Sequence, residues 1–186
     1  YSGGYVAVTT TAPTEGYWMK NSGAQVYNYT DIQVVTHAPI AAAGGWNLIG
    51  GYELTVGTSG ITTNPPGLQD GPVYEYSGGY QVASNLVPGY GYWIKLTGAG
   101  DIIIPEVLAK GTEPVEYFAE DWGKIVLTDA SGVNYTLYAV KGEVDLNQYE
   151  LPPAPPAGMV DIRYGSGRIA EDINSSIKTI EMNGIT

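Results

Sequence analysis

The chemistry open to this chain is limited by its small number of reactive side chains. The sequence contains one histidine, His37, and no cysteine. A transition-metal site needs several imidazole or thiolate ligands, and a serine–histidine–aspartate triad would depend on His37 alone. His37 precedes Ala38-Pro39, so we expect it to be an ordinary surface residue of a loop.

Paired carboxylates could in principle hydrolyse a glycoside, and the chain contains one dense acidic cluster. It lies in a predicted linker and comprises Glu113, Glu116, Glu120 and Asp121. We expect a solvated acidic stretch there, because a linker does not hold two carboxyl groups at a fixed separation. The sequence therefore predicts no catalytic residue, and we expect that the chain is not an enzyme.

Calcium suits the remaining ligands better than zinc does, because its ligands are carboxylate and carbonyl oxygens. Asp70 in the stretch LQDGP is one candidate ligand, and Asp129 with Asn134 forms a second candidate group. The sequence contains no D-x-[DN]-x-[DN]-G loop. Calcium is thus the one cofactor that the sequence leaves open, and the main expectation is that no cofactor is bound.

The most distinctive pattern is aromatic and occurs twice, as GYWMK at 16–20 and GYWIK at 91–95. Tyrosine and tryptophan rings offer a flat apolar surface with a polar edge, which suits the apolar face of a neutral sugar ring. The candidate ligand-binding residues are Trp18, Trp93, Trp46, Tyr74, Tyr76 and Tyr80.

Side chains alternate between the two faces of a strand. If 90–96 is a strand, Tyr92 and Ile94 share the core face and Trp93 and Lys95 point the other way; the first copy follows the same pattern. Two interpretations of the outward indole remain open. Either a loop or neighbouring module covers the ring, with the lysine stem lying across it, or the ring is an exposed platform for a sugar.

The aromatic motif belongs to a longer internal repeat. Residues 1–29 align with 76–104 without gaps, and 12 of the 29 aligned positions are identical. The second copy is preceded by a predicted strand at 44–56, GGWNLIGGYELTV, whereas the first copy has no such front half. Either the chain is cut within a repeat, or another copy supplies the missing strand by strand exchange.

The composition indicates a loop-rich β protein, with 26 glycines, 12 prolines and 16 tyrosines. We predict an all-β fold of antiparallel sheets in a β-sandwich, divided into two small modules. Residues 1–107 form the repeat-containing module, and residues 108–186 form an Ig-like module that is expected to be truncated. The second module contains a predicted hairpin at 124–140, a proline-rich extended stretch at 151–158 and two later strands.

The net charge of −11 argues against binding to nucleic acid or to an anionic membrane surface, because both need clustered basic residues. It fits a protein whose partners are neutral molecules or cations. We therefore expect a polysaccharide, or neighbouring modules of the same parent chain, as the partner.

Two stretches resemble segments of large secreted proteins from Bacteroidota- and Ignavibacteria-type bacteria. GGWNLIGGYE with the later GYGYWIKLTG resembles a repeat in these proteins, and LPPAPPAGMVDIRYGSGR resembles the segment before their terminal sorting domain. The resemblance implies β-rich, extracellular or cell-surface modules exported by the type IX pathway. We predict a non-catalytic carbohydrate-binding module, and the alternative is a structural spacer, an adhesive or a filament-forming repeat.

Overall fold

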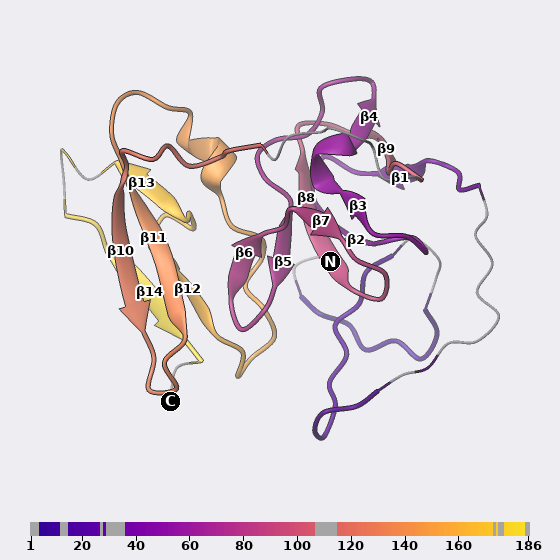
Figure 1. Ribbon diagram of the computed structural model, residues 1–186, viewed down its shortest axis with the longest axis horizontal. Coiled ribbons are helices and arrows are strands. Elements are labelled where there is room, and N and C mark those ends of the chain that lie inside the picture. The colour runs from indigo at the N-terminus through magenta and orange to yellow at the C-terminus, as the bar shows by residue number, and fades with distance from the viewer. Residues whose placement is uncertain are drawn as a thin grey trace.

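A computed structural model describes residues 4–11, 15–26, 28, 36–106, 115–172, 174 and 177–184. Within these residues the chain forms short β-strands and two short 3-10 helices, which are arranged as two lobes (Figure 1). The predicted fold class is confirmed, because the protein is all-β and has several antiparallel sheets. None of the helical segments in the described residues has the length and apolar character that crossing a membrane requires.

The first lobe contains a four-stranded main sheet of order β2-β8-β5-β6. A three-stranded sheet of order β1-β9-β4 and the pair β3-β7 accompany it, and the 3-10 helix η1 (Thr58–Gly60) follows β3. The strands are β1 (Ile40–Ala42), β2 (Gly45–Gly50), β3 (Val56–Gly57), β4 (Thr62–Asn64), β5 (Tyr74–Tyr76), β6 (Tyr80–Val82), β7 (Asn85–Leu86), β8 (Gly91–Leu96) and β9 (Gly100–Ile103).

Strand β8 contains the second copy of the aromatic motif and pairs with β2 in register over six positions, from Gly45 opposite Leu96 onward. Its side chains alternate as predicted: Tyr92 and Ile94 enter the core of the first lobe, whereas Trp93 belongs to a second cluster. The first core comprises Ile40, Ile49, Val56, Ile61, Val73, Ala83, Leu86, Tyr92, Ile94, Leu96, Ile102 and Ile104.

The first copy of the motif does not form the equivalent strand. Within residues 15–26 only Glu15 makes a strand-type bridge, to Ile49 of β2, and the N–H of Gly16 donates to the Leu48 carbonyl at 3.1 Å. Because β8 occupies the other edge of β2, the two copies flank the same strand. Beyond Gly16 the chain leaves this edge, and Met19 is exposed.

The second lobe contains a sheet of order β10-β11-β13 and the pair β12-β14, with the 3-10 helix η2 (Leu146–Tyr149) between β11 and β12. The predicted hairpin at 124–140 is confirmed by β10 and β11, whose turn is closed by a hydrogen bond from Gly132 N–H to the Asp129 carbonyl. The Ig-like assignment stays a prediction, and one pairing, β11 with β13, is parallel. The strands are β10 (Gly123–Thr128), β11 (Asn134–Val140), β12 (Asp161–Tyr164), β13 (Ala170–Asp172) and β14 (Ile180–Asn183).

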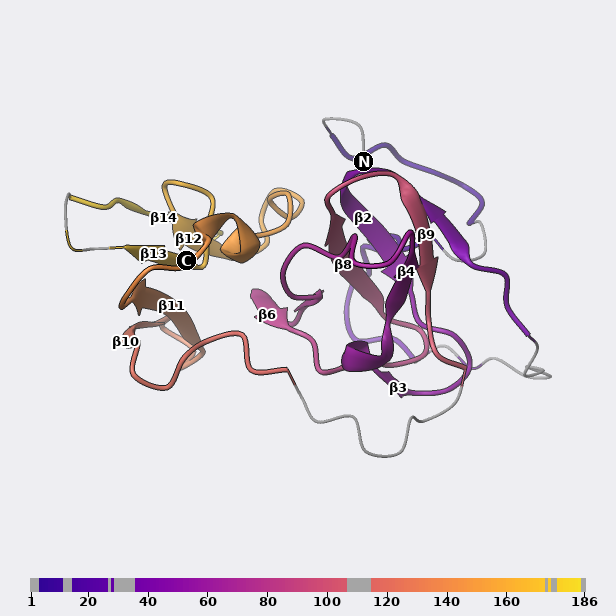
Figure 2. The ribbon, with the colours of Figure 1, turned by 90° about the horizontal axis from the view of Figure 1, so that it is seen from above.

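A second hydrophobic core joins the lobes. It takes Tyr74 and Trp93 from the main sheet of the first lobe, and its other buried members come from the second lobe. The views in Figures 1 and 2 place β10–β14 to one side of the main sheet. This second core comprises Tyr74, Trp93, Trp122, Leu137, Val140, Leu151, Ile162, Tyr164, Ile169 and Ala170. Both faces of β8 are therefore covered.

Candidate functional site

The six aromatic residues predicted to bind sugar fall into two groups in the structure. Trp46, Tyr74 and Trp93 form one group, which we call the junction triad; Tyr74 and Trp93 are buried and Trp46 is half-buried. The ring centroid of Trp46 lies 5.9 Å from that of Tyr74 and 6.4 Å from that of Trp93, and both ring pairs meet edge to face. The other three residues meet at a second, less buried place near the N-terminal segment.

Trp93 is 2 % exposed, so the interpretation of its indole as an open platform is wrong. The physical reason is that the outward face of β8 is the face on which the second lobe packs. Trp122 and Leu137 of that lobe lie in the same hydrophobic cluster as Trp93. Of the two interpretations, cover by a neighbouring module is the one that the structure shows.

Tyr74 is also inaccessible to a ligand, because it is fully buried. Burial raises the pKa of the Tyr74 hydroxyl, so the group stays protonated. Its oxygen has no hydrogen-bond partner among the described residues. An unpaired buried hydroxyl is unfavourable, so Tyr74 contributes to the junction through its ring and not through its polar end.

Two residues of the second group, Tyr76 and Tyr80, bind the second lobe within and just after its proline-rich stretch. We call Tyr5, Tyr76 and Tyr80 the tyrosine clamp, because their hydroxyls donate to carbonyl oxygens of residues 151–160. The three acceptors are the carbonyls of Ala154 at 2.9 Å, Val160 at 3.0 Å and Pro153 at 2.7 Å, respectively. Prolines have no N–H group, so a proline-rich chain offers mainly carbonyls and ring surface to a partner.

Trp18, the repeat counterpart of Trp93, supports this clamp. It is half-buried and lies edge-on to the Tyr5 ring at 6.2 Å and to the Tyr76 ring at 5.1 Å. The Tyr76 ring in turn lies 5.5 Å from the Tyr80 ring. The two copies of the motif thus place their tryptophans in different aromatic clusters, and both clusters contact the second lobe.

Lys95 forms an ionic connection between the lobes. Its Nζ lies 3.0 Å from Asp70 Oδ2 in the first lobe and 2.7 Å from Glu150 Oε2 in the second lobe, and it donates to the Asn147 carbonyl at 3.3 Å. Burial lowers the pKa of Lys95, but the hydrogen bonds and charges of Glu150 and Asp70 outweigh this effect, so the pKa is raised. Lys95 is therefore firmly protonated at neutral pH.

The calcium candidates have protein partners. Asp70 pairs with Lys95. Asp129 Oδ1 accepts hydrogen bonds from the N–H and hydroxyl of Ser131 and from the N–H of Val133, and these bonds lower the pKa of Asp129. Asn134 Oδ1 accepts from the Thr128 hydroxyl at 2.6 Å. The described residues contain no group of three metal-ligating side chains, and calcium binding stays a prediction.

His37 lies outside helices and strands, in agreement with the predicted loop, but it is not an ordinary surface residue. Its side chain is only 18 % exposed, and its ring stacks on Tyr52 with centroids 3.7 Å apart. His37 Nε2 lies 3.2 Å from Glu53 Oε1, and its backbone N–H donates to Glu106 Oε1 at 2.6 Å. Both glutamates are distant in sequence, so no local pattern identifies this cluster.

The predicted acidic cluster does not converge on a site. Glu116 and Glu120 are exposed, and Asp121 Oδ2 lies 3.3 Å from Lys141 Nζ in a pair whose side chains are both exposed. Glu113 lies outside the described residues. These positions agree with the interpretation of a solvated acidic stretch.

Glu171 is a buried carboxylate in the second lobe. Lys178 Nζ lies 3.6 Å from its Oε1 and Arg168 Nη1 lies 3.4 Å from its Oε2. Burial raises the pKa of Glu171, but the hydrogen bond from Ser166 and the two cationic groups outweigh it, so the pKa is lowered. Glu171 is therefore ionised in the folded protein at neutral pH.

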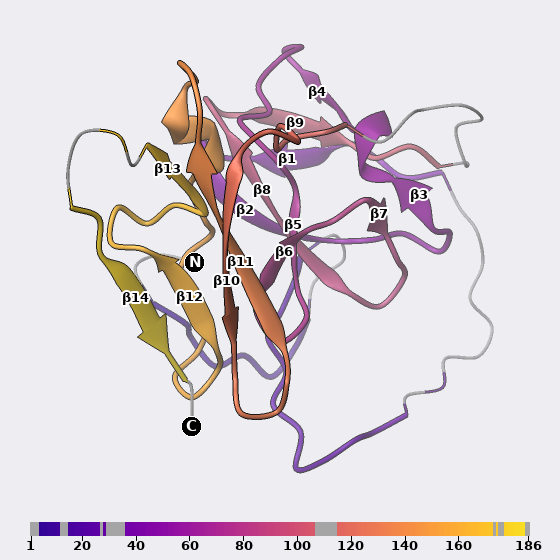
Figure 3. The ribbon, with the colours of Figure 1, turned by 60° about the vertical axis from the view of Figure 1, so that its left-hand side comes forward.

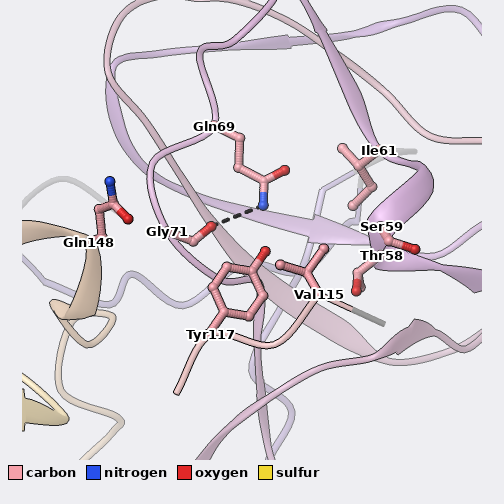
Figure 4. A pocket seen from close by; sticks show the side chains of 8 residues that line it. All are labelled: Thr58, Ser59, Ile61, Gln69, Gly71, Val115, Tyr117 and Gln148. Atoms are coloured by element: carbon pink, nitrogen blue, oxygen red, sulfur yellow. Dashed lines mark hydrogen bonds between the residues drawn. The ribbon is translucent and has the colours of Figure 1, made fainter. Parts of the chain in front are cut away.

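A polar pocket of about 310 Å³ lies where the two lobes meet. Figure 4 shows Gln69 of the first lobe and Tyr117 of the chain leading to the second lobe approaching the pocket from opposite sides. Gln69 Nε2 donates to the Gly71 carbonyl at 3.0 Å, and Gln148 lies beside Gly71 at the left of the view. The described lining residues are uncharged, and none of them is one of the six aromatic candidates.

Comparisons with protein-family models, with curated proteins and with solved structures find no match to this chain.

Proposed function

We propose that this chain is a non-catalytic structural unit of a secreted multi-domain protein, in which two β lobes are fixed to each other and act as a spacer. The observation that carries the proposal is the position of Trp93. The most distinctive residue of the repeated motif is sealed between the lobes, in a core to which both lobes contribute.

Three further contacts support a fixed junction. The tyrosine clamp binds carbonyls of the proline-rich segment, and Lys95 pairs with carboxylates from both lobes. At a third place the backbones meet closely, because a Cβ atom added to Gly71 would collide with the carbonyl oxygen of Gln148. Hydrophobic, hydrogen-bonded and ionic contacts therefore oppose independent movement of the lobes.

Carbohydrate binding by the six aromatic residues receives less support from this geometry. Trp93 and Tyr74 are buried, and the hydroxyls of Tyr76 and Tyr80 are occupied by the chain itself. An aromatic ring that stacks on sugar needs one open face, and these rings contact other parts of the protein instead. The extracellular or cell-surface location is part of the proposal and is supported by the sequence resemblance.

Two glycines of one loop offer a matched test of the fixed junction. Gly71 and Gly67 both have positive φ, +83° and +80°, so alanine strains the backbone at either position. Only at Gly71 would the new Cβ meet the second lobe, whereas nothing lies within 4 Å of a Cβ at Gly67. Gly71→Ala therefore separates the effect of wedging the lobes apart from the effect of backbone strain.

We expect wild type and Gly67→Ala to unfold in one calorimetric transition and to give the small-angle scattering of one rigid particle. Gly71→Ala should show a larger radius of gyration and a second transition. The proposal fails if wild type already shows two transitions and a variable lobe arrangement. It also fails if Gly71→Ala and Gly67→Ala are indistinguishable in both measurements.

A further inference from the structure

A groove of about 400 Å³ lies between the β5–β6 hairpin of the first lobe and β11 of the second lobe, and we call it the hairpin groove. The two hairpins that border it can be followed in Figure 3. Apolar side chains of the second lobe, including Ile162 and Ile169, line part of it. No residue of the junction triad lines the groove.

Aromatic rings that line the hairpin groove are held in place by contacts with neighbouring side chains and backbone groups. Tyr138 stacks on Phe118 with ring centroids 3.9 Å apart and planes 3° from parallel. Tyr80 donates its hydroxyl to the Pro153 carbonyl, and Tyr135 donates its hydroxyl to Asp129. Rings fixed in this way lose little conformational entropy when a ligand binds, which favours affinity.

Neutral hydrogen-bonding groups accompany these rings. Gln81 and Asn134 both line the groove and are exposed. Gln81 uses its Nε2 to donate to the Ser77 carbonyl, and Asn134 uses its Oδ1 to accept from Thr128. The opposite atom of each amide, Gln81 Oε1 and Asn134 Nδ2, makes no hydrogen bond within the described part of the chain. One acceptor and one donor therefore remain for a ligand.

The charge of the groove selects the class of ligand. The described residues that line it are all uncharged, and the chain as a whole carries −11. An anionic ligand would find no cationic partner there, and a wholly apolar ligand would bury the two amides without hydrogen bonds. We propose that the hairpin groove binds a neutral oligosaccharide, whose C–H face packs on the Tyr135 ring and whose hydroxyls bond to Gln81 and Asn134.

Titration calorimetry with a panel of soluble hexasaccharides tests this site directly. The panel contains β-1,4-glucan, xylan, mannan, chitin and β-1,3-glucan fragments, and oligogalacturonate serves as the acidic comparison. We expect at least one neutral ligand to bind with a Kd between about 1 μM and 1 mM, and oligogalacturonate not to bind.

Variants then locate the binding. Tyr135→Leu should weaken binding about tenfold, whereas Tyr135→Phe keeps the ring and should stay within about twofold of wild type. Gln81→Ala should weaken binding about fivefold, because one hydrogen bond is lost. Gln25→Ala is the matched control, since Gln25 is also exposed but does not line the groove, and it should leave the Kd unchanged.

Three results would overturn the assignment. The first is the absence of binding to every neutral glycan at millimolar concentration. The second is glycan binding that Gln81→Ala and Tyr135→Leu leave unchanged while circular dichroism shows both variants to be folded. The third is binding of the uncharged apolar dye N-phenyl-1-naphthylamine, lost in Tyr135→Leu, without a response to any glycan, which would mark an apolar partner instead.

Discussion

Replacing Trp93 by alanine removes the largest side chain that the repeated motif places in the shared core. Trp93 is 2 % exposed, so nearly all of its surface is lost from water on folding. A tryptophan buries up to about 250 Å², and alanine leaves roughly 150 Å² of that contact unfilled. At about 25 cal/mol per Å² this corresponds to about 4 kcal/mol, which agrees with the usual 3–5 kcal/mol for such truncations.

The repeat provides an internal control for this substitution. Trp18 occupies the same place in the motif but is half-buried and outside both cores, so we expect Trp18→Ala to cost only about 1–2 kcal/mol. Tyr90 is 66 % exposed at a turn, and Tyr90→Ala should stay within about 0.5 kcal/mol of wild type. Urea unfolding at neutral pH, followed by far-UV circular dichroism, gives all three free energies.

The result that would refute this reasoning is equality of the two tryptophan variants. If Trp93→Ala costs less than about 1 kcal/mol, or no more than Trp18→Ala, the cavity argument fails, because a filled junction cannot lose its central ring without a penalty. The lobes would then be held by contacts other than the shared core.

Four smaller predictions concern polar groups of the junction and the second lobe. Tyr74→Phe removes a buried hydroxyl that has no partner among the described residues, so it should raise the free energy of unfolding by about 1 kcal/mol. Tyr80→Phe breaks a hydrogen bond, so it should lower the free energy of unfolding by a similar amount. Urea unfolding measures both changes. Lys95→Met should lower stability by about 1–3 kcal/mol at pH 7, because two carboxylates lose their cation. Folding raises the pKa of Lys95, so its contribution to stability is complete below the ordinary lysine pKa of about 10.4 and is lost as pH rises through the folded value. The free energy of unfolding of Lys95→Met should therefore fall less than that of wild type over this alkaline range. Folding lowers the pKa of Glu171, so its contribution to stability is present above about pH 4.3 and is lost as pH falls through the folded value. The free energy of unfolding of Glu171→Gln should not show this loss between neutral and acid pH.

Local patterns in the sequence predict the strands but not what covers them. The two-residue alternation in β8 correctly assigns Tyr92 and Trp93 to opposite faces, and the turn residues at 129–132 correctly predict the second-lobe hairpin. Alternation identifies the outward face, but it carries no information about the second lobe that packs there. The same limit applies to His37, whose glutamate partners come from remote segments.

The two copies of the motif show this limit within one chain. GYWIK forms a strand because β2 pairs with it over six positions, whereas the nearly identical GYWMK touches β2 only at its start. Intrinsic strand preference is almost equal in the two, so the motif's own sequence does not decide the outcome. A nearly identical sequence therefore gives a buried tryptophan in one copy and a half-buried tryptophan in the other.

The tyrosine clamp affects how easily a protease can cut the proline-rich segment. An irregular stretch between strands is where proteases usually cut, because it can unfold locally and enter a cleft in extended form. Here three phenol hydroxyls hold carbonyls of residues 151–160. Cleavage of this stretch requires the clamp to release it first, so the clamp serves as a guard against proteolysis.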